Sequence, residues 1–287
     1  MTSQSSQPTN ARILRNPVIL LIFAVCIALV ILNIAIYGQS DYWSTFVSTI
    51  FNPLFAFFVT ILAVILLVQV LPNARARALW IGLVLGWACW TVAEIIWTYY
   101  FIKGQEVPYP SLADLFWCVG YIPMSVALAL RLHSTRGKAS RWNQILIVLI
   151  CLAIIGFTVI AILLPIIRAN DPSARLESFL NLFYPFGDVV LIILALLILF
   201  STNRSTFSVS WFWISLGFLM SSFSDLFFSY LNIIEMYYPD GHATLMSIFL
   251  VDLPYTISYL LFMVGLVALA QMKSTPVSVN LPPVSRA

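Results

Sequence analysis

Eight long apolar runs constrain this chain more than any other feature of its sequence. They lie near residues 17–37, 52–71, 79–101, 112–131, 144–167, 179–200, 209–231 and 245–271. The hydrocarbon core of a bilayer needs about 20 apolar residues per helical crossing, and each run is long enough for one. Hydrophobic residues fill 61% of the 287 positions and charged residues only 9%, against about 25% charged in a soluble domain. We predict an all-α polytopic membrane protein with eight transmembrane helices.

The two chain ends are interpreted as tails outside the membrane. Residues 1–16 are polar, and Arg12 and Arg15 precede the first apolar run as they would in a signal peptide. That run lacks a small-residue cleavage site and is long enough to span, so we interpret it as a retained helix. The predicted organisation is a polar tail at 1–16, a membrane domain at 17–271 and a disordered tail at 272–287.

Basic residues in the short loops predict the orientation. One side of an eight-span layout carries Arg12, Arg15, Arg75, Arg77, Arg131, Arg136, Lys138, Arg141, Arg204, Lys273 and Arg286. The other side has only Lys103, Arg168 and Arg175, together with the acids Asp41, Glu106, Asp171, Glu177, Glu235 and Asp240. By the positive-inside rule both termini are cytoplasmic, which predicts a multi-pass protein of the inner (cytoplasmic) membrane.

Several function classes lack the residues they need. The four cysteines lie inside apolar runs without Cys-x-x-Cys spacing, so we expect neither disulfides nor metal ligation by them. No lysine lies mid-span to form a Schiff base, and His133 and His242 fall on opposite sides, which excludes a bis-histidine haem. No HExxH, GxSxG or glycine-rich phosphate loop occurs. We expect a non-enzyme without a nucleic-acid partner, and the sequence leaves the cofactor and any metal undefined.

The chain resembles itself at an offset of 131 to 138 residues. The matched segments are Phe51-x-Pro53 with Phe183-x-Pro185, each at a predicted span start, then Glu94-x-x-Trp97-x-Tyr99 with Asp225-x-x-Phe228-x-Tyr230, then Asp114 and Tyr121 with Asp252 and Tyr259. This predicts two parallel four-helix repeats, 17–131 and 144–271, related by a pseudo-two-fold axis along the membrane normal. Chance similarity between apolar segments is the alternative.

Five acids fall inside the predicted spans, all toward the non-cytoplasmic side: Glu94, Asp114, Asp188, Asp225 and Asp252. A charge at a helix centre costs at least about 2.5–3.5 kcal/mol on insertion scales, so such residues usually face the bundle interior, pair with a partner or are protonated. No lysine or arginine lies mid-span to pair with them. We predict an outward-facing acidic cavity formed by Glu94, Asp225 and Asp252, with Asp114 and Asp188 at its mouth, and we add Trp97, Tyr121 and Tyr259 as ligand-binding residues.

Each acid also has a purely structural explanation. Ser111-Leu-Ala-Asp114 has the spacing of a capping box, and Asp188 follows Pro185, which frees backbone groups that a carboxylate can bond. Asp225 shares a helical face with Ser221, Ser222 and Ser229, which is typical of hydrogen bonding between helices.

The remaining acids and the boundary aromatics have similar alternatives. Glu94 lies on a stripe with Trp87, Trp90, Trp97 and Phe101, and Asp252 precedes Pro254, which predicts a bend in the last span. The tyrosines near the non-cytoplasmic boundary indicate an interfacial aromatic belt, an anchoring role, and include Tyr99, Tyr100, Tyr109, Tyr237 and Tyr238.

A family resemblance follows from these motifs. The patterns Pro110-Ser111-Leu-Ala113-Asp114-Leu-Phe116 with Gly120-Tyr121, Tyr184-Pro185-x-x-Asp188, Ser224-Asp225 with Tyr230, and Asp252 with Tyr259 resemble a polytopic membrane sensory module. Such modules precede diguanylate cyclase, phosphodiesterase or histidine kinase domains in bacterial signalling proteins. The resemblance covers about residues 45–265 and implies a signal-receiving bundle with acidic motifs facing outward.

The region after the last span differs from that family. Only Met272–Ala287 follows it, so the resemblance implies signal transduction through a membrane protein partner or a separate output protein. The alternative function is a non-catalytic accessory or assembly subunit of a larger membrane complex, whose acids only join helices. A proton-coupled transporter is a third possibility.

Overall fold

The computed structural model describes residues 15–37, 41–70, 74–105, 107–134, 140–169, 174–201, 206–239 and 242–274. Most of the two predicted tails lies outside these ranges. Several charged residues also lie outside the described ranges: Arg12, Glu106, Arg136, Lys138, Asp171, Arg204, Asp240 and Arg286. The side chains of Asp41, Arg75 and Lys273 are not described either. The part of the orientation prediction that depends on these residues is therefore not tested by the structure.

The described residues form helices α2 (Pro17–Ile36), α3 (Asp41–Val70), α4 (Ala74–Ile102), α5 (Leu112–Ser134), α6 (Arg141–Phe157), η1 (Thr158–Leu163), α7 (Leu164–Ala169), α8 (Arg175–Ser201), α9 (Thr206–Ile233), η3 (Ser247–Asp252) and α10 (Leu253–Ser274). The two η segments are π-helical turns. Because α6, η1 and α7 are continuous, as are η3 and α10, these residues contain eight helices long and apolar enough to cross a membrane. The predicted all-helical class and the number of helices of membrane-spanning length are confirmed for the described residues.

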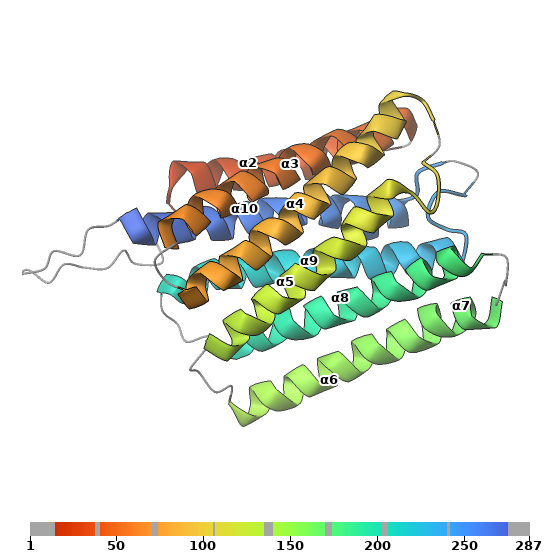
Figure 1. Ribbon diagram of the computed structural model, residues 1–287. Helices are drawn as coiled ribbons and strands as arrows, with labels where there is room; N and C mark the ends of the chain where they lie inside the picture. The colour runs from red at the N-terminus through yellow and green to blue at the C-terminus, as the bar shows by residue number, and fades with distance from the viewer. Residues whose placement is uncertain are drawn as a thin grey trace, which may run out of the picture.

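Six of these helices form a ring (Figure 1). Helices α3, α4 and α5 pack in sequence, as do α8, α9 and α10, and contacts of α5 with α8 and of α10 with α3 close the ring. Helix α2 packs mainly on α10, and α6 with η1 packs on α8 and α9. The first and last described helical residues lie at one end of the bundle, the terminal end, whereas the loops after α4 and α9 lie at the distal end.

Two helices begin earlier than the apolar runs predicted near 52–71 and 179–200. Helix α3 begins at Asp41 and α8 at Arg175, so Pro53 and Pro185 lie inside helices. Proline removes one backbone hydrogen bond from a helix, but a long apolar helix tolerates the loss where neighbouring groups satisfy the freed carbonyl. Directly before Pro254, where the sequence predicts a bend, the helix has the π-helical turn η3, and the Leu253 N–H donates to the Ile248 carbonyl.

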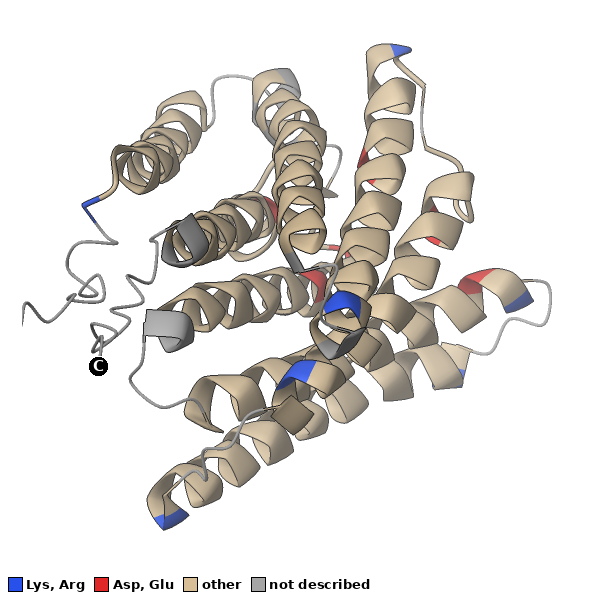
Figure 2. Cartoon of the chain, turned by 60° about the vertical axis from the view of Figure 1, so that its left-hand side comes forward, with Lys and Arg blue, Asp and Glu red and all other residues tan. Residues whose placement is uncertain are grey.

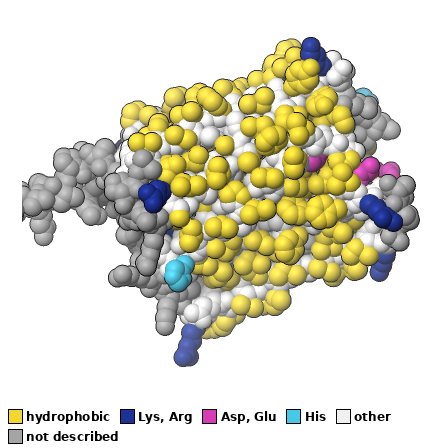
Figure 3. Space-filling view, viewed as in Figure 1, with side chains coloured by type: hydrophobic (Ala, Val, Ile, Leu, Met, Phe, Trp, Pro, Cys, Tyr) yellow, Lys and Arg dark blue, Asp and Glu magenta, His cyan; other side chains and the backbone are white. Residues whose placement is uncertain are grey.

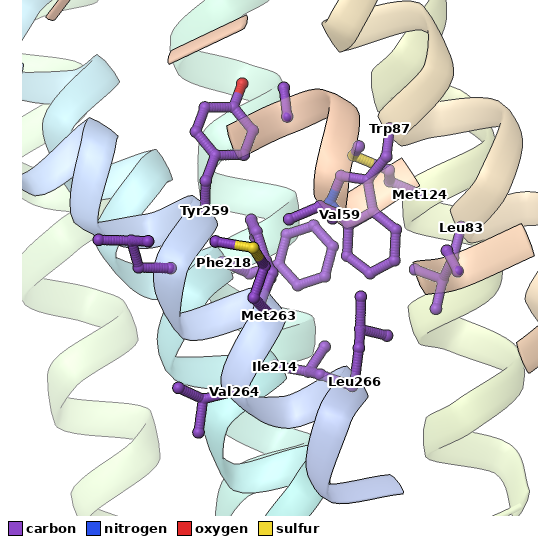
Figure 4. Close-up of a cluster of buried hydrophobic side chains, with 14 of the residues drawn as sticks. Val59, Leu83, Trp87, Met124, Ile214, Phe218, Tyr259, Met263, Val264 and Leu266 are labelled. Atoms are coloured by element: carbon purple, nitrogen blue, oxygen red, sulfur yellow. The ribbon is translucent and has the colours of Figure 1, made fainter. Parts of the chain in front are cut away.

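Large aromatic side chains fill the terminal half of the ring (Figure 4). The rings of Trp87 and Phe218 stack at 6.0 Å with 12° between their planes, and Phe262 lies 5.1 Å and 4.7 Å from them. Nearer the terminal end, Trp80 and Trp211 lie 6.4 Å apart. These distances fall in the favourable range for aromatic pairs. None of the five side chains is more than 4% exposed, so this half of the ring is a packed core.

Close helix approach supports the same core. A Cβ atom on Gly265 of α10 would lie 2.7 Å from the Ser210 carbonyl oxygen and 2.6 Å from the Ile214 side chain of α9. A backbone oxygen cannot move aside as a flexible side chain can, so only glycine allows α9 and α10 to pack this closely.

Hydrophobic side chains cover the face of the bundle between its two ends, and Lys and Arg lie at the ends (Figures 2 and 3). From the helix bounds, Arg77, Arg131 and Arg141 lie at the terminal end, and Arg168 and Arg175 lie at the distal end. Arg131 is buried with its guanidinium 4.8 Å from the centre of the Trp211 ring. This separation matches the loop pattern of the sequence, while the side that faces the cytoplasm stays a prediction.

Candidate functional site

A cavity of about 710 Å³ occupies the distal half of the ring. Its wall includes Val107 and Tyr109 from the loop after α4 and Tyr237 and Tyr238 from the loop after α9, so it extends to the distal end of the bundle. Its volume is typical of a small-molecule site. None of the described lysine, arginine or histidine residues lines it. Five carboxyl side chains do: Glu94, Asp114, Glu177, Asp225 and Asp252.

Six of the eight residues predicted to bind ligand line this cavity: Glu94, Asp114, Asp225, Asp252, Trp97 and Tyr121. The other two, Asp188 and Tyr259, are 0% exposed and stand behind the wall. Asp188 therefore does not lie at the mouth. Helix α8 begins at Arg175, ten residues before Pro185, and this places Asp188 deep in the bundle instead of near a helix start.

Glu94 of α4 is held by tyrosines of α10. Its Oε1 accepts a hydrogen bond of 3.2 Å from the Tyr259 hydroxyl, which also lies 3.3 Å from the Tyr255 hydroxyl. Glu94 itself is 4% exposed. A buried carboxyl group is expensive without donors, so this tyrosine pair explains how α4 carries an acid at this depth and fixes it against α10.

A second acid is held in the same way by Tyr121 of α5. Its hydroxyl donates to Asp188 Oδ1 at 2.8 Å, and the Asp225 carboxyl lies within hydrogen-bonding reach of the same hydroxyl. A phenol has one hydrogen to donate, so Tyr121 cannot serve both carboxyl groups as a donor at once. The Ser222 hydroxyl faces Asp188 as a further polar neighbour.

These acids form one electrostatic group. Asp225 is close enough to interact with the carboxyl groups of both Asp188 and Glu94. Asp188 and Asp225 come from the consecutive helices α8 and α9, whereas Glu94 comes from α4, far from both along the chain. The cavity therefore gathers carboxyl groups from parts of the chain that are far apart in sequence.

Asp114 has the structural role that its spacing indicates. Its Oδ2 accepts from the Ser111 N–H at 2.7 Å and from the Ser111 hydroxyl at 2.8 Å, while Ser111 Oγ accepts from the Ala113 N–H at 3.2 Å. This capping box confirms the prediction and places a carboxylate at the N-terminus of α5, where the helix dipole favours it. Oδ1 accepts from the Tyr184 hydroxyl of α8 at 2.7 Å, so the cap also joins two helices.

Asp252, at the end of η3, is held by two neighbouring tyrosines. The hydroxyls of Tyr237 and Tyr238 donate to its Oδ1 and Oδ2 at 2.8 and 2.9 Å. Burial and the adjacent Asp252 carboxylate raise the pKa of Tyr237, which keeps this phenol protonated and donating. Both tyrosines therefore serve the cavity wall, beyond the anchoring role that the sequence indicates.

Tyr109 differs from its sequence-based interpretation in the same way. Its hydroxyl donates to Asn181 Oδ1 at 2.6 Å and so links the loop after α4 to α8. Burial, followed by the nearby Asp114 carboxylate, raises the pKa of this phenol, so it remains a donor. Tyr99, in contrast, is 56% exposed and fits an anchoring role.

Other wall residues escape the sequence analysis, although helical spacing gives their signal. Trp117 lies three residues after Asp114 and four before Tyr121, and Tyr255 lies four before Tyr259. Residues three or four apart share a helix face, so counting one turn from each predicted site residue finds both. Tyr184 lies four residues before Asp188 and carries the same signal. Asn52 carries none, because only the packing of α3 brings it to the cavity.

Among the residues that the structure describes, no three His, Cys, Asp or Glu side chains converge closely enough to hold a metal ion. The four cysteines are free, as expected. The site therefore consists of hydrogen-bonded carboxyl groups and aromatic rings around an internal space.

Comparison with known proteins gives no relative for this site: no protein-family model, no curated protein and no solved structure matches the chain. Its chemistry has to be argued from the geometry above.

Proposed function

We propose that this protein is an integral membrane, sensor-like module that binds a small ligand in the distal cavity and passes the signal to a membrane protein partner. In this proposal the eight helices cross the inner membrane, both termini face the cytoplasm and the cavity faces outward. The observation that carries the proposal is the convergence of carboxyl groups from α4, α5, α8, α9 and η3 on a cavity of ligand size. Such a cavity with convergent polar groups is the usual form of a binding site.

Contacts between equivalent residues support the proposed duplication. Two pairs, each 131 positions apart in the sequence, pack across the ring between α4 and α9: Trp80 with Trp211 and Trp87 with Phe218. Glu94 and Asp225 have the same offset, and their carboxyl groups are close enough to interact electrostatically. Residues near a two-fold axis contact their own equivalents. The cavity would then lie on the pseudo-two-fold axis, where sites in repeat-built membrane proteins tend to occur.

Two further contacts have counterparts in the other half. The bond from Tyr259 to Glu94 corresponds to the approach of Tyr121 to Asp225. The bond from Thr256 to Asn52, at 2.6 Å, corresponds to the contact between Cys118 and Tyr184. The first helix of each proposed repeat departs from this pattern, because α2 packs on α10 whereas α6 packs on α8 instead of on α5. These contacts therefore support a repeat of three helices, α3 to α5 and α8 to α10, with α2 and α6 packed against the two repeats in different ways.

The packed terminal half favours a sensor over a transporter. The aromatic side chains of Trp87, Phe218 and Phe262 are 0% exposed below the cavity, so the cavity ends inside the bundle. A ligand that enters a blind cavity can change the packing of the surrounding helices, which is what a receptor requires.

The test uses the full chain in lipid nanodiscs. Three tryptophans, Trp90, Trp97 and Trp117, line the cavity and report on its occupancy by fluorescence. We expect titration with protons, potassium, magnesium or tetramethylammonium to change this signal. The change should disappear in a variant with Glu94→Gln and Asp225→Asn, and persist in Glu235→Gln, whose carboxyl is exposed on a distal loop.

Two outcomes contradict the sensor. One is an unchanged response in the double variant with normal helical content by circular dichroism, and the other is a wild-type protein that responds to none of these ions. Native purification tests the accessory role directly, because co-migration with a larger complex in a fixed ratio would favour that alternative.

A further inference from the structure

The charge of the cavity wall is unbalanced. Five carboxyl side chains line it without a described basic residue among them, and Lys103 at the distal end lies 5.7 Å over the Tyr99 ring instead. Clefts lined by charge of one sign concentrate ions of the opposite sign. A positively charged ligand in this cavity would supply the partner that the carboxyl groups lack among the described residues.

Asp225 is the carboxyl group best placed to receive that charge. Both oxygens of Asp114 and of Asp252 already accept hydrogen bonds from protein donors. Among the donors of the described residues, only the Tyr121 hydroxyl lies within reach of Asp225, and the single hydrogen of that hydroxyl goes to Asp188. Asp225 lines the cavity and has Glu94 as its acidic neighbour, so two carboxyl groups face one position.

Aromatic rings surround the same position. Trp90 and Trp97 lie one helical turn to either side of Glu94 on α4, Phe228 lies one turn from Asp225 on α9, and all three line the cavity. The face of an aromatic ring attracts a cation within about 6 Å of its centre, and rings grouped this way recognise alkylated ammonium groups.

The size of the cavity favours an organic cation over a metal ion as the ligand. A volume of about 710 Å³ is far more than a bare ion fills, and small molecules bind in cavities of about 300–1,000 Å³. Calcium needs six to eight oxygen ligands at close range, whereas most acceptors in this wall are already bonded and the remaining surface is largely aromatic.

From this charge, geometry and lining we propose that the cavity binds an organic cation, an alkylated amine or quaternary ammonium compound with an apolar body. Its ammonium group would lie between Asp225 and Glu94, and its apolar part against the tryptophans. The inference rests on the proposed binding function of the same cavity and names its ligand class.

The test compares two thiol reagents of opposite charge and similar size, a trimethylammonium-ethyl and a sulfonatoethyl methanethiosulfonate. Both are applied from the distal side to a full-length variant that lacks the four native cysteines and carries Ser229→Cys in the cavity wall. Gln105→Cys, on the exposed loop after α4, is the matched control. We expect the ratio of cationic to anionic modification rates at position 229 to exceed that at position 105 by at least about tenfold. Adding Asp225→Asn should bring the two ratios together.

Protection of the Ser229→Cys variant in nanodiscs by benzyltrimethylammonium gives the second measurement, with its neutral carbon isostere neopentylbenzene as control. We expect the cation, and not the isostere, to protect Ser229→Cys from modification. Equal reaction with both thiol reagents, or equal protection by the isostere, would overturn the cation inference and leave a binding cavity in place. Failure of both reagents to reach position 229 while position 105 reacts would overturn the proposed binding function as well.

Discussion

The distal and terminal halves of the six-helix ring are built from the same helices but have opposite chemistry. In the distal half, Glu94 of α4 and Asp225 of α9 both line an internal cavity and are close enough to interact electrostatically. Seven residues further toward the terminal end, or about two helical turns, the equivalent positions hold Trp87 and Phe218, whose rings stack. Helix geometry thus brings the same faces together in both halves, and the side chains alone decide whether the result is a core or a site.

The difference also separates stability from function. Packed aromatic side chains contribute dispersion and exclude water, whereas carboxyl groups at membrane depth are destabilising unless donors satisfy them. The terminal half can therefore offset the cost of the distal half. Substitutions in the terminal half should mainly lower the free energy of unfolding, whereas substitutions in the distal half should mainly weaken ligand binding.

The largest effect is expected from Trp87→Ala. Trp87 is 0% exposed, and removing a large buried aromatic side chain leaves a cavity that costs about 3–5 kcal/mol in the free energy of unfolding. Unfolding by sodium dodecyl sulfate in mixed micelles measures it. Trp97→Ala is the distal control, because Trp97 is 37% exposed and its loss should cost about 1 kcal/mol or less. Equal losses of unfolding free energy in the two variants would contradict the assignment of the stabilising core to the terminal half.

A smaller effect is expected from Gly265→Ala, which tests how tightly the terminal half is packed. The added methyl group would meet the Ser210 carbonyl at 2.7 Å, and overpacking of this kind costs about 1–3 kcal/mol. Gly156→Ala on α6 is the matched control, because nothing lies within 4 Å of its Cβ position. There alanine should stabilise the helix by up to about 1 kcal/mol. A neutral Gly265 variant in the same unfolding assay would show that α9 and α10 can separate freely.

Two tyrosine substitutions in the distal half are expected to have effects of similar or smaller size. Tyr121→Phe leaves the buried Asp188 Oδ1 without its donor, which costs about 1–3 kcal/mol. Tyr109→Phe removes an exposed bond to Asn181 at the rim, and the loss should be about 0.5–1.5 kcal/mol. Thermal melting of the purified variants ranks them. A rim substitution that costs more than the buried one would mean that Tyr121 does not organise the acids.

The sequence alone determined the features that depend on local periodicity and composition. Run lengths gave eight helices, and Ser111-Leu-Ala-Asp114 gave a capping box that forms with the expected donors. These predictions succeed because apolar length and cap spacing are properties of a few neighbouring residues.

Only the tertiary structure decided which side chains share the cavity and which stand behind it. Asp188 is buried against Tyr121, and Tyr237 and Tyr238 bond Asp252 instead of only marking a boundary. The physical reason is that these contacts join helices far apart in the sequence. Their geometry depends on how the ring closes, through contacts of α5 with α8 and of α10 with α3, and no local pattern of residues encodes that closure.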